Sequence, residues 1–388
     1  MDDPAGRASS RPAQNRFDRM EWAGAFGDFG TLIPFLVVYI SVLQMNATGV
    51  LLAFGGAMVV AGLYYRTPFP VQPMKAIGAV VAAQAVQTAV VTPGAVIAAA
   101  LVTGLLWLFL GLSGLAARVS KLVPPIVVAG IVLGLGLGFM LEGVKMMQTG
   151  WWIAAFGAAG TLLLLNNRSI PAMLVLLLFG AAVGLYQDPS IAGKLAASAW
   201  RFSPPTLGLT GLARGDLVLG TLFLALPQLP LTLGNAVVAI KEENNRLFPH
   251  APVTERKVAV STGLMNLFGA GVGGVPMCHG AGGMAGHMAF GARTGGSVVI
   301  LGSILLALAF FFGDSVLLLF KLFPASILGV ILFFTGAQLA IGAGPLSQRR
   351  DERLVLLATA VMCMWNVAIG MAIGIALHHL ARKGLLRL

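Results

Sequence analysis

The sequence predicts an all-α polytopic membrane protein with about fourteen transmembrane segments, arranged as a 7+7 inverted repeat. Three observations predict this fold: an apolar composition, a series of long apolar runs, and basic residues that fall on one side of these runs. Of the 388 residues, 57% are apolar and 10% are charged, whereas a soluble domain carries about 25% charged residues. So few charged side chains do not cover a soluble surface of this size, and the surrounding solvent must be largely lipid.

Most of the apolar runs are long enough to cross or nearly cross a bilayer, which takes about 20 helical residues. The first half of the chain has runs at 22–43, 47–65, 74–91, 94–117, 122–141, 151–165 and 170–186. The second half has runs at 217–240, 258–271, 279–290, 297–312, 315–341, 354–366 and 367–380. A break at Asn366 separates the last two runs, and it decides between fourteen segments and thirteen or fewer. The 50 glycines favour close packing of these helices.

Basic residues accompany the breaks between the runs. The net charge is +11, but it is spread over short connections, as membrane topology requires, and not over a nucleic-acid-binding face. With the N-terminus in the cytoplasm, fourteen crossings place most Lys and Arg on the cytoplasmic side and leave only Lys75 within the membrane. This bias predicts a multi-pass protein of the cell inner (plasma) membrane with both termini in the cytoplasm.

The third run of each half is short and interrupted. In the first half it reads PFPVQPMKAIGAV, and in the second half GGVPMCHGAGGMAGH. The prolines of the first segment keep the chain extended until a short helix begins near Met74. The second segment does the same with Gly and Pro, and its helix begins near Cys278 or His279. Interrupted segments at matching places in two inverted halves indicate a transport site at mid-membrane.

These two short helices present their N-termini to one another, and each N-terminus offers unpaired N–H groups and a partial positive charge. The arrangement predicts a site for an anion. We expect the substrate to contact residues at the two N-termini and polar residues of the run at 217–240. These residues are Gln72, Met74, Lys75, Ala76, Gln228, Thr232, Asn235, Cys278, His279, Gly280 and Ala281.

Two ionisable residues stand out within the apolar runs. Lys75 lies in the first turn of a short helix, where insertion costs about 2.5–3.5 kcal/mol, so a bound anion or Asp28 is expected to offset its charge. The alternative is that Lys75 reaches water and only helps topology. Asp28 is interpreted as a residue for proton coupling, as a partner of Lys75, or as a contact between helices.

Enzymatic functions are not supported. Cys278 and His279 are neighbours, and His287 follows, but the further ligands of a zinc site are missing. The sequence contains no phosphate-binding loop and no signature of a hydrolase or protease. We therefore expect no metal, no cofactor and no catalytic residue.

Four stretches of the sequence resemble the molybdate transporter family, a relative of the SulP sulfate permeases. They are GDFGTLIPF, PFPVQPMKAI, LPQLPLTLGNAV and MCHGAGGMAGHMAFGARTGG, and the last two are similar to the two signature motifs of that family. The resemblance extends over residues 22–380. It implies a secondary active transporter that imports a tetrahedral oxyanion, molybdate first and sulfate second, with proton coupling as one expectation. A nucleobase-type carrier on the same fold is the alternative from another substrate class.

The resemblance also implies a division into domains and an elevator-type movement. The first repeat, 22–187, would contribute core residues 22–117 and gate residues 122–187, and the second repeat, 217–380, core residues 217–313 and gate residues 315–380. The core would carry the anion past a static gate. Residues 188–216 would form an extracytoplasmic linker. The segments 1–21 and 381–388 would be cytoplasmic tails, the first disordered, with no C-terminal regulatory domain. A homodimer through the gate domain is one arrangement that the sequence leaves open.

Overall fold

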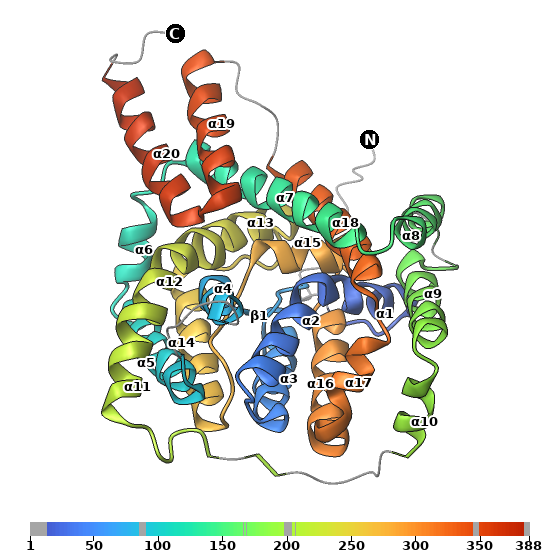
Figure 1. The fold of residues 1–388 in the computed structure, drawn as a ribbon. Helices are drawn as coiled ribbons and strands as arrows, with labels where there is room; N and C mark the ends of the chain where they lie inside the picture. Colours follow the sequence, from blue (N-terminus) through green and yellow to red (C-terminus); the bar gives the residue numbers. More distant parts are fainter. Residues whose placement is uncertain are drawn as a thin grey trace, which may run out of the picture.

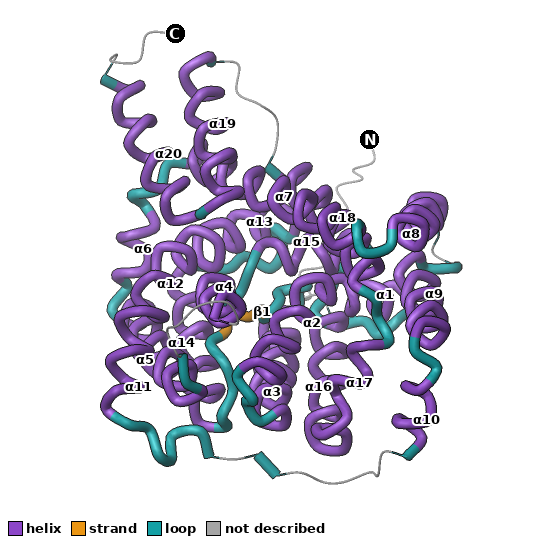
Figure 2. Tube along the Cα trace, viewed as in Figure 1, coloured by secondary structure: helices purple, strands orange, loops and turns teal. Residues whose placement is uncertain are grey.

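The computed structural model describes residues 14–84, 91–165, 167, 169–197, 204–205, 207–343 and 349–383, and this part of the chain is mostly helical (Figures 1 and 2). The first half comprises α1 (Arg19–Ala25), the 3-10 turn η1 (Phe26–Asp28), α2 (Phe29–Val37), the π-helical turn η2 (Val38–Val42), α3 (Ala47–Tyr65), β1 (Gln72–Pro73), α4 (Lys75–Gln84), α5 (Pro93–Leu112), α6 (Leu115–Ser120), α7 (Pro125–Met147), α8 (Trp151–Leu164), α9 (Ala172–Gln187) and α10 (Ser190–Ala196).

The second half has a similar order of elements. It comprises α11 (Arg214–Leu219), the π-helical turn η3 (Gly220–Ala225), α12 (Leu226–Leu231), the π-helical segment η4 (Thr232–Ala239), α13 (Ile240–Leu247), α14 (Glu255–Gly271), β2 (Met277–Cys278), α15 (Ala281–Ala289), α16 (Gly296–Phe312), the 3-10 turn η5 (Gly313–Ser315), α17 (Val316–Lys321), α18 (Ala325–Gly342), α19 (Arg350–Trp365) and α20 (Val367–Arg382).

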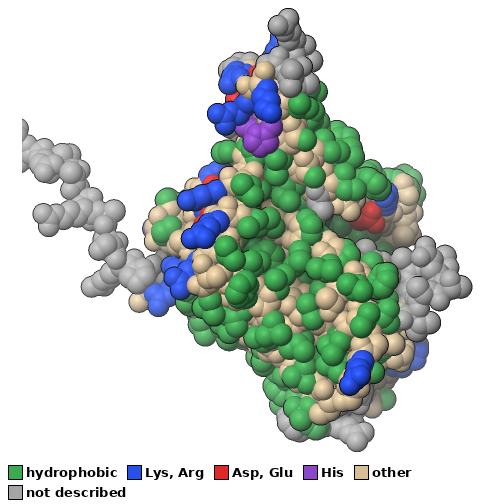
Figure 3. Space-filling model, turned by 90° about the vertical axis from the view of Figure 1, so that its left-hand side faces the viewer, with side chains coloured by type: hydrophobic (Ala, Val, Ile, Leu, Met, Phe, Trp, Pro, Cys, Tyr) green, Lys and Arg blue, Asp and Glu red, His purple; other side chains and the backbone are tan. Residues whose placement is uncertain are grey.

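Several helices have the length and apolarity of membrane spans. In the described residues there are six: Arg19–Val42, Ala47–Tyr65, Pro93–Leu112, Pro125–Met147, Arg214–Leu247 and Ala325–Gly342. A seventh arises if α9 and α10, which meet at a bend of 101°, count as one broken span. The surface view shows broad apolar areas, with Lys and Arg gathered mostly toward the upper part (Figure 3). The chain is therefore a multi-pass membrane-type fold, as its composition predicts.

Long helices from the two halves pack in pairs: α3 lies along α16, α5 along α14, and α7 along α18. Glycines allow the close approach of α7 and α18. A Cβ atom added at Gly143 would lie 2.7 Å from the carbonyl oxygen of Gly329, and one added at Gly329 would lie 2.6 Å from that of Gly143. Gly136 and Gly336 make the same reciprocal contact, at 2.7 and 2.6 Å. The prediction that glycine serves close helix packing is confirmed for this pair.

The two interrupted segments meet at the centre of the molecule. Gln72 and Pro73 of β1 pair in antiparallel fashion with Cys278 and Met277 of β2. The proline-rich lead-in is extended as predicted, and α4 begins at Lys75. The second short helix begins at Ala281, later than the sequence indicates. The helix was predicted to begin near Cys278 or His279. Its first turn lies two residues beyond His279 because Cys278 lies in the strand pair and Gly280 is the N-cap residue.

Local breaks refine other predicted segments. The run at 315–341 is divided between α17 and α18, because Pro324 ends one helix and caps the next. The run at 94–117 is divided at Gly114, whose φ of 73° ends α5 and begins α6. The predicted break at Asn366 is confirmed: α19 ends there in an extended residue, and α19 and α20 pack as a hairpin. In Figure 1 this hairpin rises from the upper edge, whereas α10 and α11 lie at the lower edge.

Candidate functional site

The start of α4 is capped by a side chain from the second half of the chain. The backbone N–H of Ala76 donates to Oε1 of Gln228 over 2.9 Å. The amide nitrogen of Gln228 in turn donates to Oγ1 of Thr232 over 3.0 Å. Both side chains are buried, and Thr232 begins the π-helical segment η4. Because π-helical turns are rare and occur frequently at functional sites, this segment marks the centre of the molecule as a place of interest.

Lys75, the first residue of α4, directs its ammonium group at an aromatic ring. Nζ lies 4.1 Å from the ring centroid of Phe139, which comes from α7. The side chain as a whole is half-buried, but Nζ itself is buried and has no hydrogen-bond partner among the described residues. This position argues against the alternative that Lys75 extends to water. A cation–π contact contributes only roughly 0.5–2 kcal/mol. It does not replace the hydrogen bonds that a buried ammonium group needs, so Nζ lacks acceptors.

Phe139 also contacts the start of α15. A Cβ atom added at Gly282 would lie 2.4 Å from the ring of Phe139, so only a glycine lets the ring lie against this turn. Gly280, the N-cap residue, has no side chain that could cap the N-terminus, and among the described residues no side chain is seen to bond the first N–H groups of the helix. A Cβ atom at Gly280 would lie 2.3 Å from Oε1 of Gln72. The first turn of α15 therefore presents bare backbone close to Lys75 and Gln72.

Asp28, Thr31 and Gln72 form a buried polar network. The amide nitrogen of Gln72 donates to Oδ1 of Asp28 over 2.6 Å and to Oγ1 of Thr31 over 3.0 Å. The hydroxyl group of Thr31 donates to the same carboxylate oxygen of Asp28. The other carboxylate oxygen, Oδ2, is buried without a partner among the described residues. Asp28 therefore holds β1 in place and keeps one free oxygen.

Unpartnered polar atoms concentrate in this region. Within the described part of the chain, buried side-chain atoms that lack a hydrogen-bond partner here are Asp28 Oδ2, Tyr39 Oη, Gln72 Oε1, Lys75 Nζ and Asn235 Oδ1. Such atoms are rare in proteins because each costs about 1–3 kcal/mol. Their concentration around the two short helices indicates a site that a polar ligand or water completes.

His279 has a different environment. Its Nδ1 lies 2.8 Å from the carbonyl oxygen of Pro70, so Nδ1 donates, and its Nε2 lies 2.8 Å from Oγ of Ser261. Oγ of Ser261 is also 2.6 Å from the hydroxyl group of Tyr65. Both ring nitrogens are therefore engaged within the protein, and the ring holds the two interrupted segments together.

The other predicted residues contribute mainly backbone. Met74 donates its N–H to the carbonyl oxygen of Pro276 over 3.0 Å. Cys278 is buried in β2 with a free thiol. Gly280 and Ala281 form the start of α15. In all, the structure brings Gln72, Lys75, Ala76, Gln228, Thr232 and Gly280 together with Asp28, and it directs the side chain of His279 elsewhere.

Two buried residues that the sequence reasoning missed position these elements. Asn266 of α14 donates its amide to the carbonyl oxygen of Met277 over 2.6 Å and accepts from the N–H of Met277 over 2.8 Å. Glu21 accepts from three backbone N–H groups at the start of α16, at 2.9, 2.9 and 3.1 Å. Asn266 could have been identified from the sequence, because an Asn within an apolar run indicates a buried polar contact. Glu21 lies at the edge of the first apolar run, where an acidic residue is common and does not indicate a buried role.

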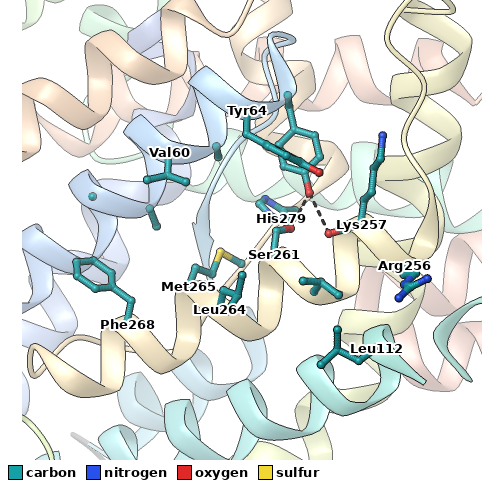
Figure 4. A pocket seen from close by; sticks show the side chains of 15 residues that line it. Val60, Tyr64, Leu112, Arg256, Lys257, Ser261, Leu264, Met265, Phe268 and His279 are labelled. Carbon is teal, nitrogen blue, oxygen red and sulfur yellow. Dashed lines mark hydrogen bonds between the residues drawn. The ribbon is translucent and has the colours of Figure 1, made fainter. Parts of the chain in front are cut away.

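Two hollows lie away from this cluster. A polar one of about 850 Å³ lies between the start of α1, the end of α15 and α18, and its lining includes Arg16, Arg19 and Arg293. An apolar groove of about 620 Å³ lies between α3 and α14, and His279 is at its floor (Figure 4). Among the described residues, no three His, Cys, Asp or Glu side chains come together to hold a metal ion.

Comparison with known proteins gives consistent matches. The family model described as "Molybdate transporter of MFS superfamily" matches residues 20–139 and 220–339. Molybdate transporter 2 of Arabidopsis thaliana is 31% identical over 412 residues, which cover 93% of this chain and 87% of that protein. Murine Solute Carrier 26 family member A9, an anion transporter solved in the inward-facing state, superposes with a TM-score of 0.63 at 12% identity, covering 97% of this chain and 70% of that one. The transmembrane domain of the cyanobacterial bicarbonate transporter BicA gives 0.59 at 15% identity, covering 93% and 100%.

Proposed function

Because this chain belongs to the molybdate transporter family, we propose that it is a secondary active transporter that imports molybdate. The observation that carries the proposal is the buried ammonium group of Lys75 beside the uncapped start of α15. Lys75 carries a full positive charge, and a helix N-terminus carries roughly half a positive charge. Both groups favour an anion at the same place, and carboxylates of the described residues form no ion pair with Lys75.

The substrate of this proposal is a tetrahedral dianion. Its oxygens accept from Nζ of Lys75, from the backbone N–H groups of Ala281 and Gly282, and from the amide of Asn235. At α4, the anion replaces Oε1 of Gln228 as the acceptor for the N–H of Ala76. Gln228 thus serves as an internal stand-in for the substrate, and it retains its hydrogen bond to Thr232.

Sulfate and a nucleobase are the two alternative substrates. Sulfate has the same charge and shape as molybdate, and molybdate is preferred because the family model and the curated relatives carry that name. A nucleobase-type carrier would need a free carboxylate to accept ring N–H groups. In the second half the corresponding polar positions are the amides Gln228 and Asn235 and not a carboxylate, and Lys75 favours negative charge, so this alternative ranks last.

The roles of the remaining predicted residues follow from their contacts. Met74, Cys278 and Gly280 shape the backbone that surrounds the anion. Gln72 links the site to Asp28. His279 takes a positioning role, because both of its ring nitrogens already have partners. No residue is assigned a catalytic role.

Helix pairing supports the proposed 7+7 inverted repeat. The sequence KLVP at 121–124 has a counterpart, KLFP, at 321–324, which is 200 positions later. The two segments matched by the family model are offset by the same amount. With this offset Gly136 corresponds to Gly336, and the two glycines contact one another. A residue that contacts the matching residue of the other repeat lies next to the two-fold axis that relates the repeats. Two paired antiparallel strands are also related by a two-fold axis that passes between them. The axis of the repeat would pass between α7 and α18 and between β1 and β2.

The same repeat frames the proposed transport cycle. The core, 22–117 and 217–313, holds Lys75, Gln228 and the start of α15, whereas Phe139 belongs to the gate, 122–187 and 315–380. Because Phe139 contacts both Lys75 and Gly282, the anion would bind at the boundary between the two domains. An elevator movement of the core would carry the anion past Phe139. The polar hollow at the end of α15, whose lining includes three arginines and Asp18, suits release on the cytoplasmic side.

The proposal also includes the coupling ion, the membrane in which the protein lies and its oligomeric state. A dianion that moves inward against a negative potential costs about 2.3 kcal/mol per charge per 100 mV, and protons supply the compensating charge. Asp28, with its free Oδ2 next to the site, is the proposed carrier. The protein lies in the plasma membrane with both termini in the cytoplasm, and the gate offers the surface for a homodimer. The opposite placement of α19–α20 and α10–α11 (Figure 1) supports this topology.

Uptake into proteoliposomes tests the function. The purified protein is reconstituted, and uptake of radiolabelled molybdate is followed with and without an inward pH gradient, with unlabelled molybdate, sulfate or uracil as competitor. We expect saturable uptake that the pH gradient accelerates, strong competition by molybdate, weaker competition by sulfate and none by uracil. Stronger competition by sulfate would reassign the substrate, and competition by uracil alone would refute oxyanion transport.

A further inference from the structure

The apolar groove between α3 and α14 has the composition of a binding site for a lipid chain. Its lining includes Val60, Tyr64, Leu112 and Leu264, which are 67%, 60%, 59% and 55% exposed. Figure 4 shows these side chains on both walls, with Phe268 at the far end. The volume of about 620 Å³ is defined by two helices and the end of α5, so it is a concave feature of the surface. An extended apolar chain is the shape that such a groove accommodates.

One end of the groove is basic. Arg256 and Lys257, in the first turn of α14, belong to its lining and are exposed. Neither forms an ion pair with a carboxylate in the described residues. The neighbouring carboxylate of Glu255 is instead held by Lys241 at 3.3 Å and by Ser120 at 3.2 Å. The lining side chains include no acidic residue in the part of the chain that the structure describes. The groove therefore combines an apolar body with two uncompensated positive charges at one end.

The dimensions of the groove correspond to one leaflet of a bilayer. Lys257 and Phe268 are eleven residues apart, which is about 16 Å along an α-helix. Half of the hydrocarbon core of a bilayer is about 15 Å. The basic end lies where α3 ends and α14 begins, next to Arg66 and the connection to α13, which the positive-inside distribution of charge assigns to the cytoplasmic side. A lipid whose acyl chain lies along the groove would thus have its headgroup at Arg256 and Lys257.

We propose that this groove binds an anionic glycerophospholipid of the cytoplasmic leaflet, with its phosphate on Arg256 and Lys257 and one acyl chain between α3 and α14. Basic pockets between transmembrane helices on the cytoplasmic side are suited to such headgroups. The floor of the groove gives the site a second feature. Tyr65, Ser261 and His279 line it and form the hydrogen-bonded series that ends at Pro70, just before β1. The bound chain rests on the residues that hold the two interrupted segments together.

Native mass spectrometry of the purified protein tests this proposal. Phosphatidylglycerol and phosphatidylcholine with the same acyl chains are added separately to the protein in detergent, and the bound fraction is measured at each concentration. We expect one phosphatidylglycerol site that is preferred over phosphatidylcholine. Arg256→Gln with Lys257→Gln should weaken phosphatidylglycerol by on the order of thirtyfold, because each basic side chain near an anionic lipid contributes about a fivefold effect. Binding of phosphatidylcholine should change little.

Matched controls separate the groove from the rest of the surface. Arg382→Gln with Lys383→Gln removes two exposed basic residues at the end of α20, and it should leave the phosphatidylglycerol preference intact. Val60→Trp with Leu264→Trp fills the groove and should abolish the site for both lipids, whereas Leu178→Trp, on the exposed face of α9, should not. An equal loss of phosphatidylglycerol binding in the two charge variants would mean that exposed basic residues attract the lipid wherever they lie, which would refute a site in the groove. Unchanged binding in the filled variant would overturn the proposal, as would the appearance of a second copy of the chain in place of the lipid.

Discussion

Asn266 provides a sharp test of how the centre of the molecule is held together. Its side chain bonds both the N–H and the carbonyl oxygen of Met277, at 2.8 and 2.6 Å. In Asn266→Leu both backbone groups lose their partner inside the membrane. Side-chain hydrogen bonds in membrane proteins contribute about 0.6 kcal/mol each on average and up to about 1.7. Two of them therefore predict a loss of roughly 1–3 kcal/mol in the free energy of unfolding.

The chain offers a matched control. Asn245 of α13 makes the same pair of bonds with the backbone of Val253, at 3.0 and 2.8 Å, but away from the two short helices. Asn245→Leu should cost similar stability. Only Asn266→Leu should also weaken molybdate binding, because only Met277 belongs to the strand that precedes α15.

The assay combines two measurements on purified protein. Denaturant unfolding in detergent gives the stability of each variant, and equilibrium dialysis with radiolabelled molybdate, at a temperature where both are folded, gives the affinity. We expect equal stability losses and a loss of affinity of at least several-fold in Asn266→Leu alone. If Asn266→Leu binds molybdate as tightly as the parent, or if Asn245→Leu loses as much affinity, the positioning role of Asn266 is refuted.

Two further predictions concern coupling and packing. Asp28→Asn, which keeps an acceptor for Gln72 and Thr31 but removes the charge, should still exchange molybdate across proteoliposomes and lose accumulation driven by a pH gradient; undiminished accumulation would make Asp28 a structural residue. Gly329→Val places a side chain against the carbonyl oxygen of Gly143, 2.6 Å from the new Cβ atom, and should cost about 1–3 kcal/mol or more in thermal unfolding. The same change at Gly160, where an added Cβ atom meets nothing within 4 Å, should cost far less, and equal losses would contradict close packing of α7 and α18.

The sequence was informative about the fold because its signals are local. Prolines at 68, 70 and 73 forbid a helix by their missing N–H groups and fixed φ, and the start of α4 at Lys75 follows directly. The start of α15 was predicted about two residues too early because Cys278 has no such constraint. It lies in a strand only because β1 is brought beside it from a distant part of the chain.

The site shows the same division between local and tertiary causes. Asp28, Lys75 and Gln228 were predicted as site residues because charged and polar residues in apolar runs are costly unless they have a purpose, and the structure brings them to the same region. Phe139 was missed because a Phe in an apolar run carries no signal, and its contact with Lys75 arises only from the packing of α7. His279 was assigned to the ligand, but Pro70 and Ser261 occupy both of its ring nitrogens, and no local pattern reveals these partners.

Binding of molybdate to the Lys75→Gln variant tests whether the anion site is built around the charge of Lys75. Glutamine keeps a polar side chain of similar length and removes the charge, and a hydrogen bond to a charged group contributes about 1.5–3 kcal/mol. We expect an affinity for molybdate that is lower by roughly ten- to a hundredfold. Lys145→Gln, which removes an exposed lysine paired with Glu142 at 3.2 Å, should bind as the parent does. Equal affinity in Lys75→Gln and the parent, with both folded, would contradict an anion site built around Lys75.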